Sequence, residues 1–99
     1  MRITSFQHKS IVDVITGVFG NSVRIMLFGS RVDDSARGGD IDLLVITDTP
    51  DRNLVTKKIK ALARLSLRLG EQKIDMILTD MKNDNRLIVK EALSKGVVL

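Results

Sequence analysis

The sequence contains no cysteine, no tryptophan and no tyrosine, and only three phenylalanines and one proline. Without cysteine the chain cannot form disulfides or thiolate zinc sites, which fits a cytoplasmic protein. So few aromatic rings argue against the stacking platforms that bind single-stranded nucleic acids. No apolar run is long enough to cross a bilayer, and the first residues lack a secretory signal pattern. We therefore expect a cytoplasmic protein without membrane contact or direct nucleic-acid binding.

The 99 residues are enough for one domain, which we place at residues 1–99. The hydrophobic fraction of 43% and the charged fraction of 28% are ordinary for a globular protein. The formal net charge of +4 permits contact with phosphates or with an acidic protein partner. A solubilising surface is the simpler explanation of this charge.

Hydrophobic spacing predicts two amphipathic helices near the two ends of the sequence. The first begins with a capping box formed by Thr4 and Gln7 and ends before Gly20. Its apolar side repeats at helical spacing: Ile11, Val14, Ile15 and Val18. The last helix spans about residues 83–94 and ends before Gly96. Four of its side chains are expected to be available for packing: Leu87, Ile88, Ala92 and Leu93.

A middle helix is predicted to begin at Thr49-Pro50, as N-cap and first helical position, and to end at Gly70. Its expected core-facing residues form one stripe: Val55, Ile59, Leu62, Leu65 and Leu69. The opposite side carries a basic row: Lys57, Lys60, Arg64 and Arg68. A solvated helix surface is the favoured interpretation of this row, and contact with phosphates or a partner is the alternative.

Residues that favour β-structure predict strands at 23–28, 40–47 and 73–79, with a short edge strand at 97–99. The helix between the second and third strands suits a right-handed parallel crossover. The short connection between the first two strands favours an antiparallel pair, and residues 31–39 are too polar for the core. The predicted fold class is therefore α+β, with a small mixed β-sheet packed against helices.

Three carboxylates converge at one end of this predicted sheet. Asp40 and Asp42 open the second strand on the same side, and Asp75 comes early in the third. Carboxylates this close repel unless they share a proton or a cation. Such a hard-oxygen cluster suits Mg²⁺ or Mn²⁺, and two such ions support an in-line phosphoryl displacement. The plainer alternatives are a solvated strand edge for the first two acids, and a cap or an ion pair with Lys73 for Asp75.

A Gly-Ser turn follows the first predicted strand and reaches the same end of the sheet. Gly29 lets the backbone approach a phosphate closely, and Ser30 adds a hydroxyl donor. Arg31 or Arg37 is available to neutralise a triphosphate, although either also suits an exposed surface. Taken alone, a Gly-Ser turn is usually a simple turn and helix cap. Together with the three acids, it predicts a site for phosphate and metal.

The chain resembles the DNA polymerase β-like nucleotidyltransferase superfamily in the stretch Phe28-Gly29-Ser30, nine further residues and Asp40-Ile41-Asp42-Leu43-Leu44-Val45. Its small size is similar to that of the minimal nucleotidyltransferase (MNT) domain proteins of bacteria and archaea. The resemblance covers essentially the whole chain, including Lys73-Ile74-Asp75. It implies the polymerase β-like fold and Mg²⁺-dependent transfer of a nucleoside monophosphate from a nucleoside triphosphate to a hydroxyl, with release of pyrophosphate.

The resemblance also implies roles for individual residues. Asp40 and Asp42 are expected to hold two Mg²⁺ ions. Asp75 is expected to complete the metal cluster and to act as the base for the acceptor, or to orient it. The expected nucleotide-binding residues are Gly29, Ser30 and Arg31.

The sequence departs from its relatives in two ways. Many carry an Arg-Gly pair soon after Gly-Ser-Arg, whereas here Arg31 is followed by Val32-Asp33-Asp34, and Arg37-Gly38 comes later. Two acids therefore lie beside the expected triphosphate. Larger relatives also carry a second, mostly helical domain that binds the acceptor, and we expect no such domain within these 99 residues. We therefore expect a protein partner to supply that surface or to be the acceptor.

Similarity to the MNT proteins implies a kind of partner. Many of them are encoded beside a helical HEPN-domain protein, often an RNase toxin, which they neutralise by binding it or by adding AMP to a tyrosine. The predicted function is transfer of AMP from ATP to such a toxin by an antitoxin, with a hetero-oligomer of the two as a natural consequence. The alternatives are a catalytically silent antitoxin that occludes its partner, and a nucleotidyltransferase that acts on a small molecule.

Overall fold

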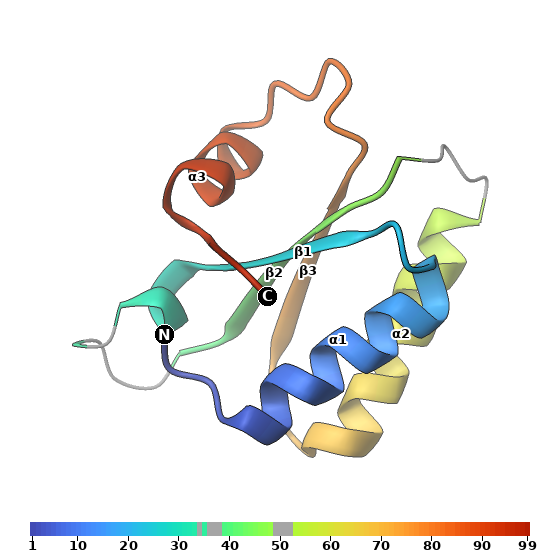
Figure 1. Ribbon diagram of the computed structural model, residues 1–99, viewed down its shortest axis with the longest axis vertical. Helices are drawn as coiled ribbons and strands as arrows, with labels where there is room; N and C mark the ends of the chain where they lie inside the picture. The colour runs from blue at the N-terminus through green and yellow to red at the C-terminus, as the bar shows by residue number, and fades with distance from the viewer. Residues whose placement is uncertain (34, 36–38, 49–52) are drawn as a thin grey trace.

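The computed structural model describes residues 1–33, 35, 39–48 and 53–99 (Figure 1). Three α-helices and one mixed β-sheet account for most of these residues, so the predicted α+β class is confirmed. In chain order the elements are α1 (Ser5–Phe19), β1 (Arg24–Phe28), the 3₁₀ helix η1 (Gly29–Val32), β2 (Ile41–Ile46), α2 (Leu54–Leu69), β3 (Ile74–Thr79), α3 (Leu87–Lys95) and β4 (Val97–Val98).

The sheet has four strands in the order β3-β2-β1-β4. Strands β2 and β3 are parallel, with Ile41 opposite Ile74 and Ile46 opposite Thr79. Strand β1 is antiparallel to β2 on one side and to β4 on the other. The parallel crossover, the antiparallel first pair and the short edge strand predicted from the sequence are all confirmed.

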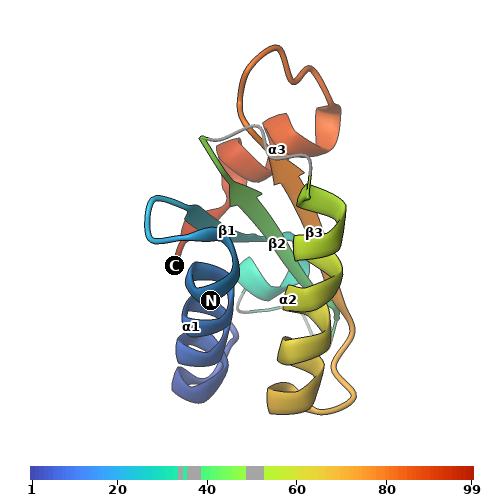
Figure 2. The same ribbon diagram turned by 90° about the vertical axis from the view of Figure 1, so that its right-hand side faces the viewer.

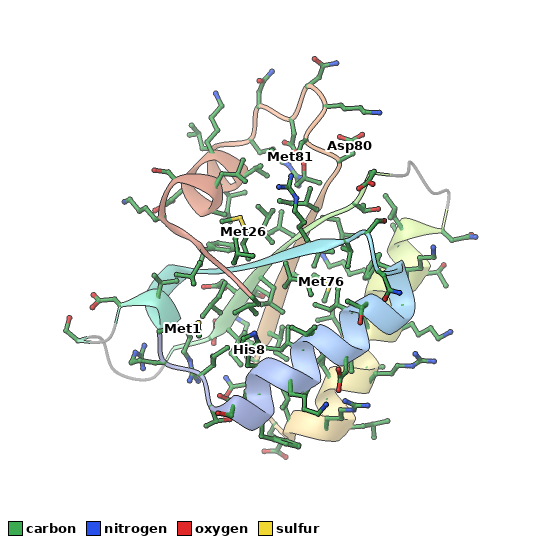
Figure 3. All side chains as sticks on the ribbon, viewed as in Figure 1. Met1, His8, Met26, Met76, Asp80 and Met81 are labelled. Atoms are coloured by element: carbon green, nitrogen blue, oxygen red, sulfur yellow. The ribbon has the colours of Figure 1, made fainter. Side chains whose placement is uncertain are left out.

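The two faces of the sheet carry different helices. Helices α1 and α2 cover one face and α3 lies on the other (Figures 1 and 2). Figure 3 shows this division through Met76, which lies toward α1 and α2, and Met26, which lies toward α3. Leu43, Leu44 and Val45 of β2 are all completely buried. The continuous apolar run of β2 is therefore explained by burial on both faces.

The helix ends follow the local chemistry of the sequence. The Thr4 hydroxyl accepts a hydrogen bond from the backbone N–H of Gln7 at 3.0 Å, and the Gln7 side chain accepts one from Thr4 at 2.8 Å. Glycines follow the last residues of the α-helices at positions 20, 70 and 96. The predicted start of the middle helix at Thr49-Pro50 lies outside the described residues. None of the described helices is long and apolar enough to span a membrane.

The C-terminal part of the predicted α2 stripe is confirmed: Leu65 is completely buried, and Leu62 and Leu69 are partly buried against the core. The N-terminal part of the stripe is wrong, because Val55 and Ile59 are 71% and 63% exposed, whereas Ala61, which the stripe did not include, is completely buried. Helix α2 contacts both α1 and β3, so the side facing the groove between them is the one that becomes buried. Apolar residues occur around much of this helix, and their spacing alone does not select the buried side.

Helix α3 begins at Leu87, later than predicted, because the preceding loop has its own hydrogen bonds. The Thr79 hydroxyl donates to Asp84 at 2.6 Å, and the Arg86 guanidinium donates to Asp84 and to the carbonyl of Leu78, both at 2.7 Å. The helix buries Val89 and Ala92, while Leu87 is 82% exposed. Of the four residues expected to be available for packing, Ala92 is confirmed in the core, whereas Leu87, Ile88 and Leu93 remain exposed because Val89 and Ala92 form the buried side.

Candidate functional site

The acids of the two parallel strands lie opposite each other. In the sheet register Asp42 of β2 is paired with Asp75 of β3, and Phe28 at the end of β1 is paired with Asp42 on its other side. The end of β1 and the beginnings of β2 and β3 therefore meet at one place. The structure brings Asp42, Asp75 and the turn that follows Phe28 together there.

The electrostatics of this pair reflect crowding of like charges. Partial burial raises the pKa of Asp42 above its ordinary value, and the negative charges of Asp75 and Asp40 raise it further. The nearby Lys73 ammonium opposes this shift only weakly, as the smallest of the contributions. A cation held between the two carboxylates would remove their repulsion.

Asp40 lies one residue before β2, and its side chain is held by a lysine. The Asp40 carboxylate is 3.3 Å from the ammonium nitrogen of Lys73, and this contact raises the pKa of Lys73. The sequence had left open an ion pair between Lys73 and Asp75, but the pair forms with Asp40. Over the described part of the chain, no three histidine, cysteine or acidic side chains are gathered in a way that could hold a metal ion.

Gly29 lies against the acid of the next strand. It has a φ of 75°, which favours glycine, and a Cβ atom placed on it would collide with the Asp42 carboxylate. The first residue of η1 therefore combines an unusual backbone conformation with a close approach to a site acid. Both the positive φ and the close approach to Asp42 therefore require glycine at position 29.

Ser30 and the returning loop are packed together in a similar way. A Cβ atom on Gly39, whose φ is 94°, would collide with the Ser30 hydroxyl oxygen. The Ser30 carbonyl accepts a hydrogen bond from the Arg2 guanidinium at 2.9 Å. Asp33 accepts two hydrogen bonds from Ser35, one from its backbone and one from its hydroxyl. Asp34 and Arg37 of the predicted loop lie outside the described residues.

The Arg31 guanidinium binds protein groups on three separate segments. Its Nε donates to the carbonyl of Gly39 at 3.2 Å, its Nη1 to the carbonyl of Arg2 at 2.9 Å, and its Nη2 to the Gln72 side chain at 3.2 Å. The N-terminal segment, the loop before β2 and the loop before β3 are thereby joined. This arrangement makes Arg31 a positioning residue for the turn.

Replacing Arg31 is expected to lower stability. Each lost hydrogen bond contributes about 0.5–1.5 kcal/mol, so Arg31→Ala should lower the free energy of unfolding by about 1–3 kcal/mol. Arg64→Ala removes an exposed α2 guanidinium that hydrogen-bonds to none of the described residues and should change stability little. Urea unfolding of both variants measures the difference. Unchanged stability in Arg31→Ala, combined with weaker nucleotide binding, would instead assign this side chain to the triphosphate.

Among the described residues, two neighbouring cavities lie at this end of the sheet. The first, of about 340 Å³, is lined by both site acids together with residues of β1, α2, β3 and α3: Asp42, Asp75, Phe28, Lys58, Leu62, Ile74, Met76, Ile77 and Ile88. The second, of about 360 Å³, adjoins the turn and is lined by Phe28, Gly29, Val32, Asp33, Ile88, Glu91 and Lys95. Phe28 and Ile88 line both cavities, so these two apolar side chains form a shared wall.

Sequence reasoning missed several of these residues. Ile88 was expected only to be available for packing, and its position on the wall shared by the two cavities was not predicted. Lys58 reaches the acid-lined cavity from α2, although the basic residues singled out on that helix were others. Phe28 was recognised as the end of a strand and the first residue of the Phe28-Gly29-Ser30 motif, but no contact with the site was assigned to its side chain. The position of Phe28 directly before Gly29 could have identified it, because a residue next to a phosphate-binding turn commonly lines the site.

Comparison with known families supports a specific assignment. The family model described as "Polymerase beta, Nucleotidyltransferase" matches residues 11–99, which include every described residue of the site except Arg2. No curated protein matches the chain.

Proposed function

The chain belongs to the polymerase β nucleotidyltransferase family, and from this premise we propose that it is an Mg²⁺-dependent enzyme that transfers AMP from ATP to a hydroxyl of a protein partner. Nucleotidyl transfer is the general activity of the family, whose members use a nucleotide and a divalent metal. The choice of Mg²⁺, of ATP and of a protein acceptor is our proposal.

The observation that carries the proposal is the juxtaposition of Asp42 and Asp75 at the Gly29 turn. Two carboxylates face each other across neighbouring strands, and burial and mutual repulsion raise the pKa of one of them. A hard divalent cation fits this donor set, because carboxylate oxygens are its preferred ligands and its charge would relieve the repulsion. Asp40, which is paired with Lys73 in this structure, would be the third carboxylate available to such a cation.

The residues of the chain have distinct tasks in this proposal. Asp42, Asp75 and Asp40 would hold the metal, which supplies positive charge to the phosphates during the in-line displacement. Gly29 allows the backbone of η1 to approach the triphosphate, and Ser30 offers it a hydroxyl donor. Asp75 faces the acid-lined cavity and would accept or orient the proton of the acceptor hydroxyl. The cavity beside η1 is available to the rest of the nucleotide.

A HEPN-domain protein is the proposed acceptor, and the chain would act as its antitoxin. The support is the similarity to MNT proteins in the Gly29-Ser30 turn and in the Asp40 and Asp42 pair. A tyrosine hydroxyl of the partner would receive AMP, and pyrophosphate would leave.

The proposal predicts a mass increase in the partner. The purified protein, ATP and Mg²⁺ are incubated with a HEPN-domain protein from the same genome, and the intact mass of the partner is measured. The expected result is an increase by one or more AMP units that disappears when EDTA removes the metal. An unmodified partner, in a sample where the chain still binds ATP, would refute the proposed acceptor.

One observation favours a second candidate function. Asp40 is paired with Lys73, and the described acids are not gathered into a metal-binding group of three. A site that does not bind the catalytic metal would be inactive, and an inactive site suits an antitoxin that works only by occluding its partner. In that case Asp40→Asn and Asp42→Asn would neutralise the toxin as well as the wild type does in a co-expression growth assay.

A further inference from the structure

Helix α2 exposes a line of apolar side chains that takes no part in the core. Val55, Ile59 and Leu67 are 71%, 63% and 88% exposed, and the exposed Ala63 continues the same spacing of four residues. Residues four apart lie on one side of a helix, so these four form a continuous stripe. Single exposed apolar residues are common, whereas a contiguous set marks an interaction site.

The fold itself does not use this stripe. Ala61 and Leu65, on another side of the helix, are completely buried, and Leu62 and Leu69 also pack against the core. Helix α2 lies between α1 and the β3 edge of the sheet (Figure 2). Within the described residues no strand pairs with the outer side of β3, so α2 and this edge form one accessible side of the molecule.

The stripe has a basic flank. Lys60 and Arg64 are exposed one helical turn apart, and neither forms an ion pair with any described carboxylate. Viewed down the helix axis, these two cations lie next to Ala63 and Leu67, on the side of the stripe that faces away from β3. An apolar stripe with a basic flank is complementary to an amphipathic helix whose apolar side is flanked by acidic residues.

We propose that the α2 stripe is the docking surface for an acidic amphipathic helix of a protein partner. A second copy of this chain fits less well. If two α2 helices paired antiparallel about a two-fold axis, both basic rows would lie on the same flank and repel. An anionic membrane also fits less well, because Asp42 and Asp75 open onto the neighbouring cavity.

The position of the stripe links docking to the site. Lys58 and Leu62 of α2 line the same cavity as Asp42 and Asp75. A helix bound along α2 and the β3 edge would therefore place the partner beside the acid pair. This step rests on the proposed function, and it explains how a hydroxyl of a protein would reach Asp75.

The docking surface is tested with two synthetic peptides. Both carry leucines along one side of a helix; one has glutamates on the margin, and its twin has lysines there. In fluorescence anisotropy the glutamate peptide should bind the wild type, and the lysine peptide should not. Ile59→Lys should weaken binding by about tenfold or more, which is about 1.4 kcal/mol. Val98→Lys is the matched control, because Val98 is 69% exposed on β4 at the opposite edge of the sheet.

A charge exchange completes the test. The double variant Lys60→Glu, Arg64→Glu should prefer the lysine peptide over the glutamate peptide. Equal binding of the glutamate peptide by wild type and Ile59→Lys would overturn the proposal. So would a wild-type dimer that Ile59→Lys dissociates, measured by light scattering, or Ile59-dependent sedimentation with phosphatidylglycerol vesicles in the absence of peptide binding.

The same assay separates docking from catalysis. Asp42→Asn should bind the glutamate peptide as the wild type does, because Asp42 is not part of the stripe. Retained peptide binding with no AMP transfer by the wild type would refute only the proposed function. Loss of peptide preference with intact transfer would refute only the docking surface. Thermal unfolding of each variant confirms that the folded state is compared.

Discussion

Asp42→Asn is expected to abolish nucleotidyl transfer without weakening the fold. Asp42 is the half-buried acid that faces Asp75 and touches Gly29, so the proposed metal site depends on its charge. Without this carboxylate the metal that would stabilise the charge of the transferring phosphate is held poorly, and loss of such stabilisation lowers the rate by about a thousandfold or more. Transfer is measured by the mass of the partner or by pyrophosphate release. Asp48→Asn, which changes an exposed acid after β2, is the control and should remain active.

The same substitution should slightly raise stability. The folded-state pKa of Asp42 is above its unfolded value, because burial and Asp75 disfavour the ionised form. The charge therefore costs stability at neutral pH, and this cost disappears as the pH falls through the raised pKa. Allowing for solvent screening, Asp42→Asn should raise the free energy of unfolding by about 0.5 kcal/mol at pH 7. A gain that persists at acid pH, or a loss at pH 7, would contradict this account.

Gly29→Ala is expected to impair both stability and activity. Alanine pays a penalty at a φ of 75°, and its Cβ would push the Asp42 carboxylate out of place. The strain and the collision together should lower the free energy of unfolding by about 1–3 kcal/mol. A displacement of this kind in a catalytic group costs about a hundredfold in rate. Urea unfolding and transfer assays measure the two effects.

Gly70→Ala separates these two causes. Gly70 follows α2 with a φ of 74°, but a Cβ atom there would meet nothing within 4 Å. Its substitution should cost about 1 kcal/mol from backbone strain alone and leave transfer unchanged. Equal losses of activity in the two variants would show that the contact between Gly29 and Asp42 has no part in the reaction.

The meeting of Asp42 and Asp75 could be predicted from the sequence because it depends on topology. A helix between two strands implies a parallel crossover, and parallel neighbours bring their first residues together. The short connection after Gly29 likewise required an antiparallel partner. These rules involve backbone direction, so they hold whatever the side chains do. The observed register bears them out.

Side-chain partners could not be predicted in the same way. Phosphate binding by Arg31 stays a prediction, whereas the hydrogen bonds of its guanidinium to Arg2, Gly39 and Gln72 were not predicted, because these residues lie in three distant parts of the sequence. Lys73 is two residues from Asp75 but pairs with Asp40, because neighbouring strands bring them closer than the chain does. Val55 and Ile59 of α2 were misplaced for a related reason: α1 and β3 determine which side of the helix is buried, and helical periodicity carries no information about them.

The position of β1 in the sheet has a consequence for synthesis on the ribosome. This strand is made early, but its neighbours β2 and β4 are made later, and β4 follows every other described element. A nascent chain that has not yet released Val97 and Val98 therefore has one side of β1 unpaired. Strand β1 leads directly into the Gly29 turn. The strand that holds this turn is therefore paired on both sides only after nearly all of these residues have been translated. Contacts between distant parts of a chain form slowly, so maturation of the site should be a late folding event.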